Sequence, residues 1–233
     1  MAISAPPPER PRVWGWRIRL RLGLAATLVC GFWLANRLTK DQPVAYPKVE
    51  EHFKYGSLGG ERESGIPLGI WKVLPKLFPE YLPGKKYLPG QEYASLGFLY
   101  EPGKTLPIGV SQRNTQGIDR VFLNCAACHA GTVRATASSP RTIYPGMPSH
   151  PVDLEGFQRF IFACPADPLF NPERLKARMQ ALAANSDLLN QAIMRYYAIP
   201  LMRERLLMLK DRFRFIAWEP DQGLAFDTHA DIA

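Results

Sequence analysis

Three residues near the middle of the chain have the types and the spacing that covalent haem attachment requires. The segment 124–129 reads Asn-Cys-Ala-Ala-Cys-His, so Cys125, Cys128 and His129 form a CxxCH pattern. Two thiols at this spacing can reach the two vinyl groups of one porphyrin and form thioethers. The adjacent imidazole can then turn under the ring and bind the iron. The sequence therefore predicts one covalently bound haem c, attached to Cys125 and Cys128, with His129 as the proximal iron ligand.

Two other uses of paired cysteines fit this sequence less well. A structural zinc site needs a second pair of ligands at similar spacing, and the sequence has none. A redox-active dithiol is typical of βαβ surroundings, whereas the residues before the motif favour a short helix. That expectation comes from side chains that recur every three or four positions, at Ile118, Val121, Phe122 and Cys125.

The sixth coordination position of the iron decides what such a haem can do. A protein ligand there gives an electron carrier, whereas a vacant position permits oxygen or peroxide chemistry. Met147 lies in a Pro-Gly-Met-Pro loop, which is typical of the methionine ligand in small cytochromes c, and it follows His129 by 18 residues. His150 and His52 are the other candidates. The sequence leaves these three residues and a vacant position open.

An apolar segment near the N-terminus predicts a membrane anchor. Residues 22–35 contain no charged side chain, and the apolar character extends to residues 18–38. Basic side chains at the two ends can extend to the membrane interfaces, namely Arg19, Arg21 and Arg37. A cleaved secretory signal is the alternative, although residues 35–37 offer no clean cleavage site. Either interpretation exports the rest of the chain.

The charge of the protein is concentrated before and around this segment. The chain has a net charge of +8, and residues 1–40 account for +6 of it. The basic excess therefore reports membrane topology rather than a nucleic-acid partner. The positive-inside rule places the N-terminus in the cytoplasm. We thus expect a single-pass protein of the inner (cytoplasmic) membrane, with lipid around residues 18–38 and the haem domain in the periplasm.

The remainder of the chain predicts helices joined by long irregular segments. The 22 prolines favour extended loops that wrap around the helices. Periodic apolar positions predict helices over residues 66–78, 152–164, 172–198 and 201–215. Residues 93–100 are expected to form a strand or a buried turn, and residues 140–151 a loop. The sequence Asn171-Pro172-Glu173 is a strong helix start, and Pro200 is expected to end that helix.

An ordered set of stretches resembles one protein family, the rubber-oxygenase-like (RoxA-like) dihaem c-type cytochromes. These are distant relatives of the dihaem cytochrome c peroxidases and MauG. The resemblance covers about residues 45–220 and is carried by residues 51–57 (EHFKYGS), 65–79, 93–98 (YASLGF) and 124–134 (NCAACHAGTVR). It implies a mainly α fold: a cytochrome c-like haem domain with long irregular Pro/Gly-rich wrapping loops.

The resemblance extends to the N-terminal haem half of that family only. Family members carry a second CxxCH motif, whereas this sequence contains only the single motif at residues 125–129. In the oxygenase the N-terminal haem binds dioxygen on its open face, and His129 matches the proximal ligand of that haem. The missing motif leaves three expectations open: a shortened homologue, a gene fragment, or one subunit of a split protein whose partner supplies the second-haem half.

These observations together predict the organisation and function of the chain. The expected segments are a cytoplasmic basic tail (1–17), the transmembrane anchor or signal segment (18–38), an extended wrapping segment (39–115), a cytochrome c-like haem domain (116–220) and a tail (221–233). The favoured function is a membrane-anchored c-type cytochrome that passes electrons to a redox partner protein. The alternatives are a haem-dependent oxygenase or peroxidase-like enzyme with an open iron site, and a haem-containing structural subunit.

Overall fold

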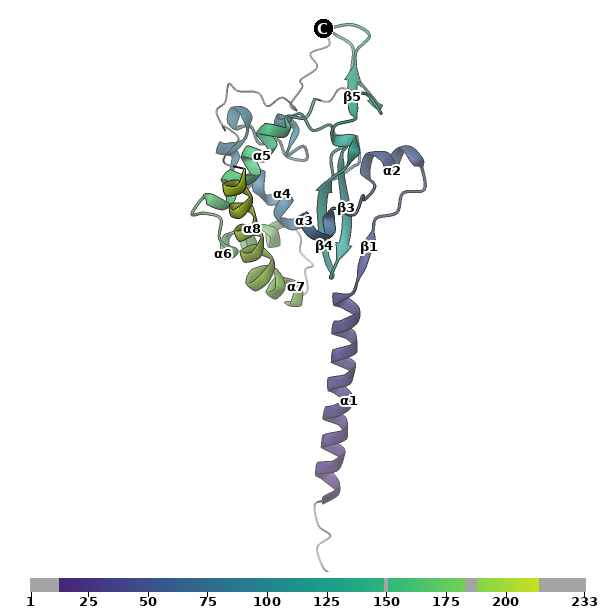
Figure 1. Cartoon of the computed structure of the whole chain (residues 1–233), viewed down its shortest axis with the longest axis vertical. Coiled ribbons are helices and arrows are strands. Elements are labelled where there is room, and N and C mark those ends of the chain that lie inside the picture. The colour runs from purple at the N-terminus through teal and green to yellow at the C-terminus, as the bar shows by residue number, and fades with distance from the viewer. Residues whose placement is uncertain (1–12, 149–150, 183–187, 214–233) are drawn as a thin grey trace, which may run out of the picture. The chain divides into compact units, whose positions relative to one another are not determined.

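The computed structural model describes residues 13–148, 151–182 and 188–213 (Figure 1). The chain forms two compact units, Met1–Lys40 and Asp41–Ala233. The residues before 13, the expected tail 221–233 and the candidate ligand His150 lie outside the described residues.

The first unit contains one long helix, α1 (Val13–Leu38). Its segment Gly15–Leu38 spans 24 residues with a mean hydropathy of 1.5, which is long and apolar enough to cross a membrane. An N-terminal signal sequence would have the same properties. Large apolar side chains are exposed along this helix, including those of Leu22, Leu28 and Phe32. A surface of this kind is stable in lipid and unfavourable in water, so the predicted apolar helix is confirmed in its length and character.

A four-stranded antiparallel sheet lies at the centre of the second unit. Its strand order is β1-β3-β4-β2, and the four strands are β1 (Asp41–Pro43), β2 (Ile66–Pro67), β3 (Val110–Thr115) and β4 (Ile118–Leu123). Strands β3 and β4 form a hairpin in which Val110 pairs with Leu123 and Thr115 with Ile118. The short strands β1 and β2 pair with the two edges of this hairpin. The edge strands of the sheet are therefore only three and two residues long, which limits the unpaired backbone they expose.

The prediction of a helix before the CxxCH motif is wrong, because residues 118–123 form strand β4. The two-residue turn at Gln116 and Gly117 has positive φ at both positions (57° and 75°), as a type I′ hairpin turn requires. Ile118 and Val121 are buried, as a helix would also place them, so the apolar spacing did not discriminate between the two structures. The turn and the pairing with β3 decide in favour of the strand.

A second, two-stranded sheet follows the motif. Strand β5 (Ala130–Val133) pairs with β6 (Thr142–Pro145), with Ala130 opposite Pro145 and Val133 opposite Thr142. Part of the loop expected at residues 140–151 is therefore a strand. The pairing brings the residues after β6 back beside the end of the CxxCH motif.

Most helices lie on one side of the large sheet, and α2 lies on the other side (Figure 1). The α-helices after α1 are α2 (Val49–Tyr55), α3 (Glu61–Ser64), α4 (Leu68–Leu77), α5 (Leu154–Ala163), α6 (Pro172–Leu182), α7 (Leu188–Ile193) and α8 (Ile199–Arg212). Short 3-10 helices occupy the proline-rich stretches: η1 (Pro79–Tyr81), η2 (Pro83–Lys85), η3 (Ala94–Leu96) and η5 (Cys164–Ala166). The expected helices at 66–78 and 152–164 correspond to α4 and α5.

The large hydrophobic core lies between these helices and the sheet. The Trp71 ring of α4 stacks on Tyr93, with centroids 4.0 Å apart, and the Tyr93 hydroxyl donates to the Trp71 carbonyl over 2.8 Å. Phe157 and Phe160 of α5 pack edge-on against Tyr93. Residues 93–100 thus form a buried turn around η3, one of the two structures expected for them.

The C-terminal helices differ from the sequence expectation at Pro200. Asn171 caps α6 as predicted, because its Oδ1 accepts from the Arg174 N–H over 3.0 Å. Helical backbone then continues from α7 through a π-helical segment, η6 (Met194–Ala198), directly into α8. Pro200 lies in the first turn of α8, where a missing N–H costs little, so it does not end the helical run.

The prediction of a mainly α chain is therefore confirmed in part. Helices make up most of the regular structure, and one of them is the long apolar N-terminal helix. Two small antiparallel sheets were not expected. The larger one supports the CxxCH motif directly, so the motif is held by a hairpin rather than by a preceding helix.

Candidate functional site

The CxxCH motif forms a single tight helical turn after strand β4. It begins with the 3-10 helix η4 (Cys125–Ala127), and Asn124 caps it: the Asn124 side-chain oxygen accepts from the Ala126 N–H over 3.0 Å. The N–H groups of Cys128 and His129 both donate to the Cys125 carbonyl, over 3.2 and 3.0 Å. One turn of backbone therefore carries both thiols and the imidazole.

The exposure of the side chains differs from residue to residue along the turn. Cys125 and His129 are exposed and Cys128 is half-buried, whereas Ala126 and Ala127 are each 1% exposed. The two alanines thus anchor the turn in the protein, and the three reactive side chains remain accessible. Burial, followed by the nearby Cys125 thiol, raises the pKa of Cys128 above its ordinary value.

One ring nitrogen of the His129 imidazole makes a hydrogen bond within the protein. Its Nδ1 lies 3.3 Å from the carbonyl oxygen of Met147, and the Gly146 N–H donates to the His129 carbonyl over 2.7 Å. A carbonyl oxygen can only accept a hydrogen bond, so Nδ1 carries the proton in the neutral ring. The lone pair then resides on Nε2, which is the form in which histidine binds a metal.

A small hydrophobic cluster lies beneath the turn. Its buried members are Tyr55, Ile108, Ala126 and Ala130, and Tyr46, Phe53, Leu99 and Ile143 pack around them. This cluster is separate from the large core and draws its residues from α2, the segment before β3, η4 and the small sheet. The motif therefore has an apolar platform of its own.

Gly109 allows the turn to approach the preceding segment closely. Its φ is +88°, and a Cβ atom there would lie 2.4 Å from the backbone of Ala127. The N–H of Gly109 donates to the Lys54 carbonyl, and its carbonyl accepts from the Asn124 N–H, each over 2.9 Å. Only glycine combines this backbone conformation with this contact.

Asn124, which caps the CxxCH turn, also joins helix α2 to that turn. The Asn124 side-chain amide donates to the carbonyl oxygens of Gly56 and Lys54, over 3.1 and 3.3 Å. Asn124 thus uses its side-chain oxygen for the turn and its side-chain nitrogen for α2. We did not assign this role from the sequence, although Asn is a favoured N-cap residue and stands directly before the motif.

A charged network joins residues of α2 to Glu101. The Lys54 ammonium contacts Glu50 and Glu101, over 2.5 and 2.7 Å, and the Tyr55 hydroxyl donates to Glu101 over 2.7 Å. Burial raises the pKa of Glu101, but the hydrogen bonds from Lys54 and Tyr55 and the charges of Lys54 and Lys104 outweigh it, so the pKa lies below its ordinary value. The buried lysine is therefore fully compensated, as a charge in this position requires.

The other candidate ligands stand in different relations to the motif. His52 lies on α2 with an exposed imidazole, and its ring lies against Gly56, the residue that accepts from Asn124. Met147 meets the motif through its backbone carbonyl. Among the described residues, no three His, Cys, Asp or Glu side chains gather to hold a bare metal ion. A haem iron does not require such a group, because the porphyrin supplies its equatorial ligands.

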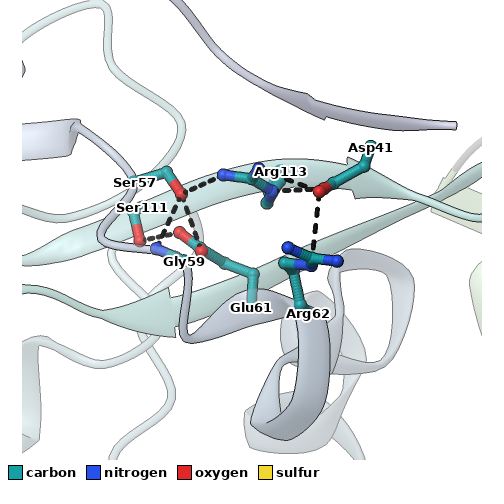
Figure 2. Close-up of polar contacts among 7 residues, drawn as sticks. All are labelled: Asp41, Ser57, Gly59, Glu61, Arg62, Ser111 and Arg113. Atoms are coloured by element: carbon teal, nitrogen blue, oxygen red, sulfur yellow. Dashed lines mark hydrogen bonds and ion pairs between the residues drawn. The ribbon is translucent and has the colours of Figure 1, made fainter.

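A second polar cluster lies at β3, around Ser111 and Arg113, and has a structural explanation (Figure 2). The fully buried Glu61 accepts hydrogen bonds from Ser57, over 2.8 Å, and from Ser111. Arg113 joins Ser57, over 3.1 Å, to Asp41, which it binds through two guanidinium nitrogens. The carboxylates are occupied within the protein, so this cluster fastens α3 and β1 to β3.

Comparisons with known proteins add no relative to this description. No protein-family model, curated protein or solved structure matches the chain.

Proposed function

We propose that this chain is a membrane-anchored c-type cytochrome that transfers electrons through one covalently bound haem. Cys125 and Cys128 would hold the haem through thioether bonds, and His129 would bind its iron through Nε2. The haem supplies a one-electron couple between ferrous and ferric iron. The protein supplies attachment, orientation of the imidazole and the surface that a redox partner meets.

The observation that carries this proposal is the hydrogen bond from His129 Nδ1 to the Met147 carbonyl. Iron-binding histidines commonly donate their second ring N–H to a backbone carbonyl or a carboxylate, which fixes the tautomer and the orientation of the ring. A histidine at a random surface position has no need of this arrangement. Here it occurs at the histidine that the CxxCH motif designates.

The surroundings of the thiols fit a haem as well. Cys125 is exposed, so a porphyrin can reach it without opening of the fold. The apolar cluster beneath Ala126 keeps the turn rigid, and Gly109 and Asn124 hold it from both sides. A rigid turn holds the sulfur atoms and the imidazole at a constant separation, which attachment at three points requires.

The apolar helix and the charge distribution support a location for this haem. Helix α1 suits a single crossing of the inner membrane, and the arginines before it and in its N-terminal part suit a cytoplasmic N-terminus. The haem unit then works in the periplasm, where c-type haems are attached. Its partner is a redox protein of that compartment or a subunit that carries a second haem.

The identity of the sixth iron ligand distinguishes the proposed electron carrier from the alternative, an oxygenase- or peroxidase-like enzyme. The Met147 carbonyl is joined to Nδ1 of His129, whereas the iron would be held by Nε2 of that ring. We therefore infer that Met147 is a support of the proximal histidine and not the sixth ligand. His52 and His150 stay candidates for a carrier. A vacant position would instead favour the oxygenase- or peroxidase-like enzyme.

One experiment separates the carrier from the enzyme. The full chain is produced with haem c maturation machinery, and the absorption spectrum of the reduced protein is recorded with and without carbon monoxide. An unchanged low-spin spectrum supports the carrier, and either His52→Ala or His150→Ala then makes the iron bind carbon monoxide. A large shift of the wild-type spectrum contradicts the carrier and supports the enzyme.

A further inference from the structure

A small cavity lies in the second unit between the sheet and the C-terminal helices. Its volume is about 120 Å³. Its walls come from the segment 63–67, from Arg120 of β4, from Tyr197 and Ala198 of η6, and from α8. A water molecule occupies roughly 30 Å³ in the liquid, so the cavity has room for a small organic molecule of a few heavy atoms.

Two arginines, Arg120 and Arg205, and one glutamate, Glu63, line this cavity. Arg120 is half-buried, and its Nε is enclosed with no hydrogen-bond partner among the described residues. Burial lowers the pKa of Arg120 below its ordinary value; the nearby Tyr197 opposes this shift, and the charge of Arg205 adds to it. Arg205 donates to the backbone carbonyl of Glu63 over 3.3 Å. No ion pair within the described part of the chain joins the Glu63 carboxylate to either arginine.

Two guanidinium groups that face one cavity repel each other, and an anion between them removes this repulsion. Guanidinium groups match carboxylate and phosphate oxygens, because their planar fork can donate two parallel hydrogen bonds. A half-buried arginine without a counter-ion is costly to the folded state unless a ligand supplies one. The cavity thus has the electrostatics of an anion site.

The remaining walls select the kind of anion. Ile66, Pro67, Leu201, Met202 and Leu206 contribute apolar surface to the same cavity. An inorganic phosphate would leave these side chains in contact with a hydrated ion. A carboxylate with a short aliphatic tail instead places its charge at the arginines and its carbons against the apolar wall.

A local irregularity of the helix forms part of this wall. The segment η6 (Met194–Ala198) is π-helical, with one extra residue in the turn. Tyr197 and Ala198 of this turn line the cavity, so the irregularity lies at the site. π-Helical turns inside α-helices are rare and occur frequently at functional sites.

We propose that this cavity binds a short-chain aliphatic monocarboxylate of about the size of butyrate, held between Arg120 and Arg205 with its tail against α8. The site is independent of the haem, because it shares no residue with the CxxCH turn. Its occupant would bridge β4 and α8 and stabilise the packing of the C-terminal helices on the sheet.

The test is calorimetric titration of butyrate into the full chain in detergent, with acetate and inorganic phosphate as comparison ligands. We expect saturable binding of butyrate, weaker binding of acetate and no detectable binding of phosphate at the same concentrations. Arg120→Gln and Arg205→Gln should each weaken butyrate binding at least tenfold. Arg205 is exposed, so its substitution tests the site even if Arg120→Gln destabilises the fold.

Arg203→Gln is the matched control. Arg203 lies on the same helix, and its Nε donates to the Pro165 carbonyl over 3.0 Å, away from the cavity. It should leave butyrate affinity unchanged. The proposal is overturned if butyrate does not bind, if phosphate binds as tightly as butyrate, or if Arg203→Gln weakens binding as much as Arg205→Gln.

Discussion

The Nδ1 atom of His129 lies 3.3 Å from the carbonyl oxygen of Met147. These residues are 18 positions apart, and the β5–β6 hairpin closes the distance between them by pairing Ala130 with Pro145. The contact has a direct consequence for Met147, because it uses the backbone of that residue and not its thioether.

Substitution of Met147 by Ala should therefore leave the iron centre intact. Alanine keeps the carbonyl that accepts from His129, so we expect the same haem content and the same low-spin spectrum as in the wild type. Optical spectroscopy of the ferric protein and redox titration measure this. Loss of a methionine–iron charge-transfer band, or new binding of carbon monoxide, would show that Met147 is an iron ligand after all.

Gly109→Ala should destabilise the protein strongly. The change introduces both a strained positive φ and a contact of 2.4 Å with the Ala127 backbone. We expect a loss of about 2–5 kcal/mol in the free energy of unfolding, measured by chemical denaturation. Gly103→Ala is the matched control, since Gly103 has a φ of +76° with nothing within 4 Å of its Cβ position. It should cost only about 1–2 kcal/mol. Equal losses would show that the contact with Ala127 has no effect.

Two substitutions at Asn124 should separate its two roles. Asn124→Ser keeps a side-chain oxygen that can cap the CxxCH turn but removes the amide that donates to Gly56 and Lys54. Asn124→Ala removes both. We expect Ala to lower the stability by about 1–2 kcal/mol more than Ser does, because it also loses the cap. Haem incorporation should fall in the same order. If the two variants are equally stable, the cap does not contribute.

Low pH should weaken the contacts that join Lys54 and Tyr55 of α2 to Glu101. The pKa of Glu101 is lower in the folded protein than in the unfolded chain, so its contribution to stability is complete above the ordinary carboxyl pKa of about 4.3 and is lost as the pH falls through the folded-state value. Denaturation midpoints between neutral and acidic pH should fall less steeply for Glu101→Gln than for the wild type. Glu92→Gln, whose carboxylate accepts from the Gly90 N–H, is the control and should keep the wild-type slope. An unchanged slope for Glu101→Gln would exclude the network as an acid-sensitive element.

The sequence identified the elements whose signals are local. The apolar α1 segment and the Asn171 cap each depend on residues a few positions apart, and the structure contains the helix and the cap. Strand β4 was mistaken for a helix because Ile118 and Val121 are buried in either structure. The signal that decides between them is the Gln116-Gly117 turn, which precedes the segment rather than lying within it.

The parts of the site that the sequence could not predict are those that tertiary structure assembles. The Met147 carbonyl reaches His129 only after the small sheet has formed. Gly109 approaches the turn because β3 and β4 pair. Methionine was expected to act through its sulfur, and no local pattern indicates that its backbone oxygen is the contacting atom.

The most direct test of a c-type haem on this chain is the intact mass of the full protein matured with haem c attachment machinery, measured together with its absorption spectrum. We expect a mass gain of one haem that survives denaturation, accompanied by a Soret band, and the loss of both in the double variant Cys125→Ala, Cys128→Ala. A wild-type protein of unmodified mass without a Soret band would contradict the assignment of Cys125, Cys128 and His129.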